Sequence, residues 1–418
     1  MIWSDIRREA RFILQKKSTV YLLIVACLLS AFSVWTGSKE VAQQHATIAR
    51  LLAADKIDRQ AVLHQQQDYG GVAYYSFHLT YAAPSSLAFA ALGARDIYPW
   101  KHRIRMLALE GQIHESDTEN PELALAGRID FSFVISVLAP LLLVLLLHDL
   151  QAVERASGRL DLLNTSAHSR FSLWPIRTGV ILLSLAVTLL LPFWFGAVIH
   201  QVTVTTLLKV TLLVVGYLTG WALLCFWVAR IPFAAPTLAS LLLGIWLLTT
   251  FIVPALANVV IEQMIKGPQG GDILMVQREA VNDAWDLPVA TTMDAFIATH
   301  PQWQSHTKMN SLFEWKWFYA FQQVGDQTAQ PLSDLYLRST ERKYQVAGWV
   351  AWLSPSTLIQ RTITNWAQTD AVAARRYQQQ VRDFHAQLRH FYYPLLFKEQ
   401  PFELDVFTQR PDFVPVKP

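Results

Sequence analysis

Five long apolar runs constrain this chain more than any other feature of its sequence. A helix needs about 20 mostly apolar residues to cross the hydrocarbon core of a bilayer, and each run is close to that length or longer. Charged residues occur at ordinary density elsewhere, so sizeable parts of the chain face water. We therefore expect a mainly α-helical, polytopic membrane protein with about five transmembrane helices, at Thr19–Thr36, Ile129–Leu147, Ile176–Ile199, Thr205–Ala229 and Pro236–Ile261.

The composition supports this class and excludes others. Apolar residues make up 52% of the 418 residues and charged residues 16%, whereas a soluble chain carries roughly 25% charge. The formal net charge of +3 is too small to indicate a nucleic-acid partner. Cys27 and Cys225 both lie inside apolar runs, where they are expected to act as small packing residues without a disulfide or a metal.

The distribution of Lys and Arg predicts an orientation. Basic residues precede the first run and lie between the second and third, where Arg155, Arg159, Arg170 and Arg177 are found. Because cytoplasmic loops carry the excess of Lys and Arg, the N-terminus is expected in the cytoplasm of a bacterium with the spans in its inner (plasma) membrane. Two large aqueous segments, residues 37–128 and 262–418, then both fall in the periplasm.

The first 17 residues have an amphipathic helical pattern of their own. Ile2, Trp3, Ile6, Ala10 and Ile13 fall near one face, with charged residues on the rest. A secretory signal peptide is the competing interpretation, but its apolar region is only about 7–15 residues long, shorter than the run that follows here. The pattern favours an interfacial helix that leads into a retained span.

The two aqueous segments are expected to be mostly helical and to pack against each other. The first is predicted to continue the first span as a helix and then to contain a short strand-like run, Arg103–Leu109. The second is predicted to contain helices at Gly271–Ala284, Ser311–Gln323, Leu332–Trp352 and Ala371–Phe391, followed by an extended tail. Its aromatic cluster favours burial against the first segment, with the membrane surface as the alternative, and comprises Trp315, Trp317, Phe318, Tyr319 and Phe321.

Motifs for energy conversion and catalysis are absent from the sequence. It contains no G-x-x-x-x-G-K-[ST] loop for phosphate binding and no G-x-S-x-G elbow for a nucleophilic serine. The 12 histidines do not stand at metal-ligand spacing. We therefore expect a non-catalytic chain without a cofactor of its own.

The segment between the second and third spans carries the most informative pattern. Glu154, Arg155, Gly158, Leu160, Leu163, Ser169 and Arg170 fit E-R-E-x-G-T-L-x-L-L-x-x-x-P-x-S-R, so the segment resembles the cytoplasmic loop of ABC-2-type exporter permeases. Ala156, Arg159 and Ala167 depart from the pattern. From its residues alone, the segment reads as a short helix that seats in a groove of a partner or as a solvated connector.

The resemblance extends to other parts of the chain. Residues 117–122 and 126–130 look like the lead-in to the second span in a branch related to the permease of nitrous-oxide-reductase maturation, which has two large periplasmic insertions. Residues 353–356 resemble its second insertion, and the N-terminal helix resembles the family's elbow helix. The implied division is 1–36 (elbow helix and first span), 37–128, 129–261 (four spans with a coupling loop at 148–175) and 262–418. Members usually have six spans, one more than here.

The resemblance implies the permease subunit of an ATP-binding-cassette transporter. Two copies of a separate ATPase would bind ATP and Mg²⁺ and contact the loop, and the other partners would be a second permease copy or paralogue, membrane lipid and a periplasmic or outer-membrane protein. The apolar spans favour an amphipathic substrate for export or extrusion. The alternative is a mechanotransmitting or assembly protein whose periplasmic domains act on a protein partner without transport. An intramembrane or periplasmic enzyme is the least favoured class.

Overall fold

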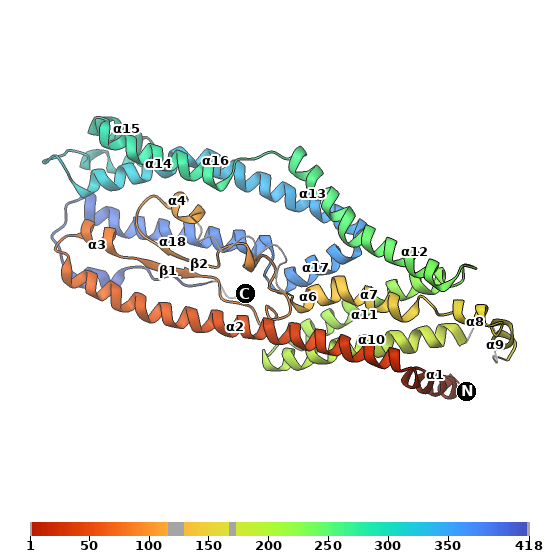
Figure 1. Cartoon of the computed structure of the whole chain (residues 1–418). Coiled ribbons are helices and arrows are strands. Elements are labelled where there is room, and N and C mark those ends of the chain that lie inside the picture. Colours follow the sequence, from red (N-terminus) through yellow and green to blue (C-terminus); the bar gives the residue numbers. More distant parts are fainter. Residues whose placement is uncertain (1, 116–128, 167–172, 416–418) are drawn as a thin grey trace.

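One uninterrupted helix of 49 residues, α2 (Lys17–Gln65), runs along most of the molecule (Figure 1). At 1.5 Å per residue it is about 74 Å long, more than twice the thickness of a hydrocarbon core. The computed structural model describes residues 2–115, 129–166 and 173–415. The molecule is elongated, with a bundle of apolar helices beside the N-terminus and a second body at the opposite end (Figure 1).

The apolar bundle contains five helices that are long and apolar enough to cross a membrane. The first is the N-terminal part of α2. The second comprises α6 (Phe131–Phe133), the π-helical turn η2 (Val134–Leu138) and α7 (Ala139–Leu147), and α10 (Leu173–Ile199) and α11 (Val204–Val228) follow. The fifth comprises α12 (Ala235–Leu247), the π-helical turn η3 (Leu248–Ile252) and α13 (Val253–Met264). The expectation of a mainly helical polytopic chain is confirmed at this level. We call these helices the span bundle.

The π-helical turn η2 is stabilised by side chains from neighbouring spans. Tyr217 of α11 donates a hydrogen bond to the carbonyl oxygen of Ser136 over 2.7 Å, and Trp246 of α12 donates to that of Val137 over 3.0 Å. A π-helical turn offsets the backbone hydrogen-bond ladder. These two side chains therefore tie the second, fourth and fifth helices together at one level.

The second body, which we call the outer domain, is built from both aqueous segments. The first segment contributes α3 (Tyr69–Tyr75), the strands β1 (His78–Tyr81) and β2 (Lys101–Ile104), and α4 (Leu109–His114). The strands pair antiparallel, with His78 opposite Ile104. The second segment contributes α14 (Gly270–Asp286), α15 (Val289–Thr299), η4 (Pro301–His306), α16 (Trp315–Val350), α18 (Ala371–Phe397) and η6 (Leu404–Gln409).

The core of the outer domain is aromatic and contains residues from both segments. Tyr69 and Ile104 of the first segment are buried in one cluster with Phe296, Tyr319 and Tyr392 of the second. Trp317, Phe318 and Phe321 are buried in the same cluster. The expected packing of the two segments against each other is therefore observed, and this aromatic cluster fills a protein core instead of a membrane surface.

Three details of the sequence-based assignment are wrong. The strand-like run Arg103–Leu109 is only partly a strand, since β2 ends at Ile104 and Leu109 begins α4. The helices expected at Ser311–Gln323 and Leu332–Trp352 form the single helix α16, which continues through Pro331. The tail expected to be extended contains the 3₁₀ helix η6. Pro331 is exposed, so water can reach the carbonyl that loses its backbone partner.

A turn of the first aqueous segment joins the outer domain to the span bundle. Residues 87–91 are fully or almost fully buried there, and the Phe89 ring stacks on the rings of Phe193 and His200, at centroid distances of 6.0 and 4.6 Å. Gly37 of α2 and Gly196 of α10 leave room for Phe89, because an added Cβ at either position would collide with it. The two glycines thus permit a close approach that larger residues prevent.

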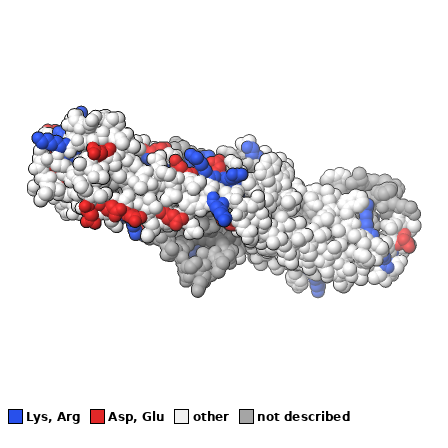
Figure 2. All heavy atoms as spheres, turned by 90° about the horizontal axis from the view of Figure 1, so that it is seen from above, with Lys and Arg blue, Asp and Glu red and all other residues white. Residues whose placement is uncertain are grey.

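The distribution of charged side chains also distinguishes the outer domain from the span bundle. Figure 2 shows Lys, Arg, Asp and Glu over the outer domain and again at the far end of the span bundle. On the described part of this face, the stretch between them is almost free of charge. An uncharged belt is what the hydrocarbon core of a bilayer requires of the surface that faces it.

Candidate functional site: the loop between the second and third spans

The segment that follows the second span lies at the end of the bundle farthest from the outer domain (Figure 1). We call this end the inner end. The segment forms two short helices, α8 (Ala152–Ala156) and α9 (Leu160–Ser166), separated by a turn at Ser157–Arg159. Gly158 in that turn has φ +70°, a left-handed conformation that favours glycine. The expected single short helix is therefore interrupted at Gly158.

Arg155 fixes α8 to the next turn at the inner end. Its guanidinium donates hydrogen bonds to the carbonyl oxygens of Ile231 over 2.9 Å and of Ala229 over 3.3 Å. These carbonyls follow the C-terminus of α11, where backbone acceptors lack partners within the helix and a positive charge is favourable. Arg155 thus points into the molecule and connects the loop to the turn between the fourth and fifth helices.

Glu154 is turned toward the loop itself. Its carboxylate pairs with Arg159 across the Gly158 turn over 3.1 Å, and Arg159 also donates to the hydroxyl of Ser157 over 2.9 Å. Arg159 is exposed whereas Glu154 is largely covered. The pair therefore holds the turn closed from its solvent side.

The N-terminal helix α1 (Ile2–Gln15) packs beside this loop. Glu9 of α1 is buried and pairs with Arg177 at the start of α10 over 2.8 Å. The Arg177 guanidinium also lies over the rings of Phe12 and Trp174, at 4.7 and 5.2 Å from their centroids. Lys16, just after α1, pairs with Asp149 over 3.1 Å. Helix α1, the loop and α10 therefore form one connected layer.

A cavity of about 430 Å³ lies within this layer. Glu154, Arg159 and Leu163 line it from the loop, and Phe12 and Arg177 line it from α1 and α10. Sequence reasoning missed the contribution of α1, because no spacing rule connects Glu9 with Arg177.

The apolar residues of the loop divide into two sets. Leu160 and Leu163 pack against the apolar core of the span bundle, whereas Leu162 is 67% exposed and Val153 is 46% exposed. Solvent-exposed leucine next to a fixed, charged frame suits contact with another protein. Leu162 and Val153 are therefore better placed than Leu160 and Leu163 to meet a partner.

The seven residues predicted for coupling thus have different environments. Glu154 and Arg155 stabilise the loop, Gly158 sets its turn, and Leu160 and Leu163 anchor it to the bundle. Ser169 and Arg170 lie outside the described residues. The sequence pattern did not distinguish the outward-facing Leu162 and Val153 from their neighbours.

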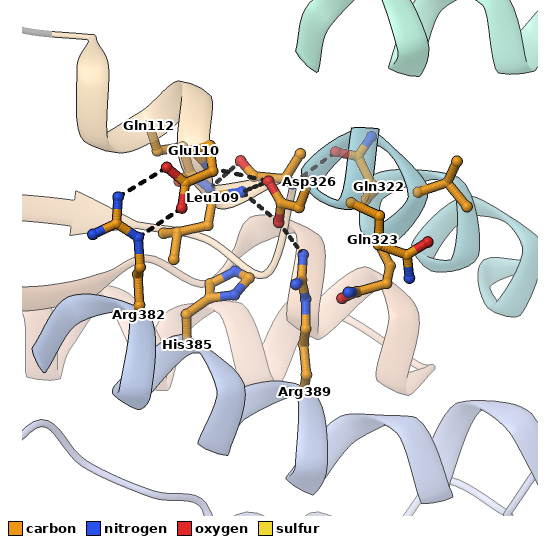
Figure 3. Close-up of polar contacts among 12 residues, drawn as sticks. Leu109, Glu110, Gln112, Gln322, Gln323, Asp326, Arg382, His385 and Arg389 are labelled. Carbon is orange, nitrogen blue, oxygen red and sulfur yellow. Dashed lines mark hydrogen bonds and ion pairs between the residues drawn. The ribbon is translucent and has the colours of Figure 1, made fainter. Parts of the chain in front are cut away.

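A second polar cluster lies in the outer domain (Figure 3). Asp326 of α16 accepts hydrogen bonds from the backbone N–H groups of Leu109, over 2.7 Å, and Glu110, over 3.0 Å, at the start of α4. It also accepts from Arg389 of α18 over 2.5 Å. A carboxylate from another helix therefore caps α4. Burial raises the pKa of Asp326, with Arg389 opposing that effect.

Glu110 is paired as closely with Arg382. The carboxylate accepts two hydrogen bonds from the Arg382 guanidinium, over 2.7 and 2.9 Å, and one from the Ser333 hydroxyl over 2.8 Å. Burial alone would raise the pKa of Glu110, but the hydrogen bonds and charge of Arg382 outweigh it and hold that pKa below its usual value. The two ion pairs join α4 of the first segment to α16 and α18 of the second.

The outer cluster has the properties of a structural connection. It borders a cavity of about 650 Å³, but its two carboxylates and two guanidinium groups already pair with one another. Among the described residues, no group of three or more His, Cys, Asp or Glu side chains is arranged to hold a metal ion.

Comparison with known proteins adds one family. A family model described as a domain of unknown function (DUF3526) matches residues 273–415, which contain Asp326, Arg382 and Arg389. No curated protein and no solved structure matches the chain. The matched residues lie in the second aqueous segment, and the description of the family assigns no activity.

Proposed function

We propose that this chain is the transmembrane permease subunit of an ATP-binding-cassette transporter of the ABC-2 type. The loop at 148–175 would receive the movement of a separate ATPase. The observation that carries the proposal is the connection of this loop, through Arg155, to the turn at residues 229–231. Any displacement of α8 is thereby passed to the fourth and fifth helices as well as to the second and third, as a lever requires.

The position of α1 supports the same proposal. An elbow helix is expected to lie along the membrane surface and to contact the coupling loop, and α1 borders the same cavity as Glu154 and Arg159. In this proposal the inner end faces the cytoplasm, where its Lys and Arg satisfy the positive-inside rule. The outer domain is then periplasmic, and the membrane is the bacterial inner membrane.

The proposed partners would supply the parts of such a transporter that this sequence does not contain. ATP and Mg²⁺ would be bound by two copies of the ATPase, and a second permease copy or a paralogue would complete the membrane part. The described interior of the span bundle is mainly apolar with a few hydroxyls, among them Ser30, which donates to the carbonyl of Leu189 over 2.6 Å. Such an interior favours an amphipathic substrate over a hydrophilic ion, and the chain itself would be non-catalytic.

A specific observation also favours a mechanotransmitting protein without transport. Helix α2 passes without interruption from the span bundle into the outer domain, and the 36-residue α16 returns toward the bundle. Stiff helices of this kind would pass a movement at the inner end to the outer domain, which would act on a protein partner. The two functions share the ATPase and differ in whether a small molecule crosses.

The proposal is tested with tagged full-length chain purified from the membranes of its own host. An ATPase should co-purify, and its turnover should depend on the loop. Gly158→Val should uncouple it, since a β-branched residue resists φ +70°, while Gly158→Asn, which tolerates that conformation, serves as the matched control. Glu154→Lys should also uncouple it, by opposing Arg159. Equal turnover for wild type and all variants would refute coupling through this loop.

A further inference from the structure

The C-terminal part of α16 and the helix after it form a hairpin without charged residues at its tip. No charged residue occurs between Lys343 and Arg361. Within this stretch α16 ends at Val350, a 3₁₀ turn η5 (Ala351–Leu353) follows, and α17 (Pro355–Trp366) reverses the chain. The stretch is too short to span a bilayer as one helix, and it is uncharged but less apolar than the five spans.

Helix α17 packs on the span bundle, and it also contacts α16 through Arg361. Its buried residues Ile359 and Ile363, with Ala367 just after it, belong to the same apolar cluster as the spans. It contacts α11, η2 and η3, and Figure 1 shows it at the junction of the bundle with the outer domain.

The contact with η3 gives the depth of this packing. Residues 248–252 lie in the middle of the 30-residue helix Ala235–Met264, about 20 Å from either of its ends at 1.5 Å per residue. If that helix crosses a bilayer, a segment that touches its middle lies inside the hydrocarbon core.

The tip satisfies its own polar groups. Ser354, between η5 and α17, is buried, and its hydroxyl accepts a hydrogen bond from the backbone N–H of Thr357 over 3.3 Å and lies 2.8 Å from the Thr357 hydroxyl. The backbone N–H of Ser354 donates to the carbonyl of Ala351 over 3.1 Å. Non-helical backbone at membrane depth is tolerated where its hydrogen bonds are satisfied within the protein.

The two limbs are also fixed at their base. The guanidinium of Arg361 lies 3.5 Å from the centroid of the Tyr344 ring, and the Tyr344 hydroxyl donates to Asp370 over 2.7 Å. Gly348 lies against Arg361, since an added Cβ would come within 3.2 Å of its guanidinium. Arg361, the first charge after the tip, thus lies against the ring of Tyr344, which directly follows Lys343, the first charge before the tip.

Beyond this base the hairpin exposes large apolar side chains. Trp349, Trp352 and Leu353 are 77%, 72% and 68% exposed, and the adjacent η3 exposes Leu248, Phe251 and Ile252. In water so much exposed apolar surface is unfavourable, whereas tryptophan is enriched where a protein meets the membrane interface. The exposed apolar surface of the hairpin is continuous with that of the fifth helix. We therefore expect lipid to surround both surfaces.

We infer that the C-terminal part of α16, η5 and α17 form a re-entrant hairpin inserted into the leaflet next to the outer domain, with Trp349, Trp352 and Leu353 against lipid. The second aqueous segment is thereby attached to the membrane at a point separate from the fifth span. The inference requires only that the five apolar helices lie in a bilayer, and it does not depend on an ATPase.

Spin labels on single cysteines test this inference in the full-length chain. Cys27→Ala and Cys225→Ala provide the background, and cysteine replaces Trp352, Leu353, Leu256 or Leu312, one at a time. Leu256 is an exposed residue of the fifth span, and Leu312 is a 98% exposed residue of the outer domain. The labelled chains are placed in vesicles of phosphatidylcholine and phosphatidylglycerol, and helical circular dichroism verifies folding.

Oxygen partitions into lipid, whereas a nickel chelate stays in water. Labels at 352 and 353 should be more accessible to oxygen than to the chelate, as at 256, and label 312 should show the reverse. Labels at 352 and 353 that behave like label 312 would overturn the inference. Strong spin–spin coupling there, with low access to both reagents, would also overturn it, since a second copy of the chain would then cover the tip.

Discussion

The guanidinium of Arg155 donates a hydrogen bond over 2.9 Å to the carbonyl oxygen of Ile231, 76 residues further along the chain. This contact joins the loop after the second span to the turn after the fourth span. The loop and the turn are therefore expected to move together as a single unit. The contact also changes the role of a residue predicted to contact an ATPase, because Arg155 is directed into the chain's own backbone.

Replacing Arg155 with lysine should weaken this unit. A lysine ammonium is a point charge and cannot reproduce the fork that reaches both Ile231 and Ala229. We expect a loss of about 1–2 kcal/mol of stability for hydrogen bonds from a charged donor, and a larger proportional loss of ATPase stimulation. Thermal unfolding in detergent measures the first effect. Arg159→Lys is the control, since the exposed Arg159 side chain can be replaced by another cation that still reaches Glu154, at a cost of about 0–1 kcal/mol; equal effects of the two changes would contradict the assigned role.

Substitution of Gly196 should disturb the docking of Phe89 on the bundle. An added Cβ at position 196 would lie 2.7 Å from the Phe89 ring and 2.8 Å from Val34, so Gly196→Ala should cost about 1–3 kcal/mol through overpacking. Gly179 lies in the same helix, and among the described residues nothing is within 4 Å of its added Cβ. Gly179→Ala should therefore be neutral or stabilise the chain by up to about 1 kcal/mol. Thermal midpoints that rank the two variants in the opposite order would refute the docking argument.

The Glu110–Arg382 pair should determine a component of the pH dependence of stability. Because the pKa of Glu110 is lower in the folded chain than in the unfolded chain, its contribution is present above the unfolded pKa and is lost as pH falls through the folded value. In Arg382→Leu, burial without a counter-charge should raise that pKa. The contribution should then be present at low pH and lost as pH rises. Unfolding midpoints between pH 3 and 8, as the difference between variant and wild type, measure this reversal.

The loss of stability on removing Arg382 distinguishes a buried ion pair from one at the surface. Arg382→Leu alone should cost about 3–5 kcal/mol near neutral pH, because it leaves a buried charge without its partner. Arg382→Leu combined with Glu110→Leu should cost less than the single change. A double variant that is less stable than Arg382→Leu by the full cost of Glu110→Leu would show that the two residues do not interact.

The spans were predictable because hydrocarbon imposes a simple requirement of length and apolarity. Their predicted and observed bounds agree within a few residues, except where α2 continues into the outer domain. The break between Ser311–Gln323 and Leu332–Trp352 was wrong because Pro331 is tolerated where its freed carbonyl can reach water. The burial of Trp317 and Tyr319 was predictable because their segment contains too many aromatic residues for a helix exposed to water. Whether they are buried in a protein core or at the membrane surface could be decided only from the positions of α14 and α18.

The candidate site was less predictable than the fold. A sequence pattern selected Glu154–Arg170 but gave no direction for each side chain, and so Arg155 and Leu162 were not distinguished. The left-handed φ of Gly158 decides which residues after the turn face outward, and the pairing of Glu9 with Arg177 depends on how α1 crosses α10. Both are consequences of tertiary packing, which local spacing does not encode.

The central claim is that Leu162 meets an ATPase at the inner end of the bundle. The most direct measurement places a photo-crosslinking amino acid at position 162 of the full-length chain in its native membrane, with position 312 of the outer domain as the matched exposed control. The account predicts an adduct at 162, and not at 312, with a protein that hydrolyses ATP and whose hydrolysis falls when Leu162 is replaced by aspartate. An adduct with that ATPase at 312 but not at 162, or hydrolysis unchanged by Leu162→Asp, would contradict it.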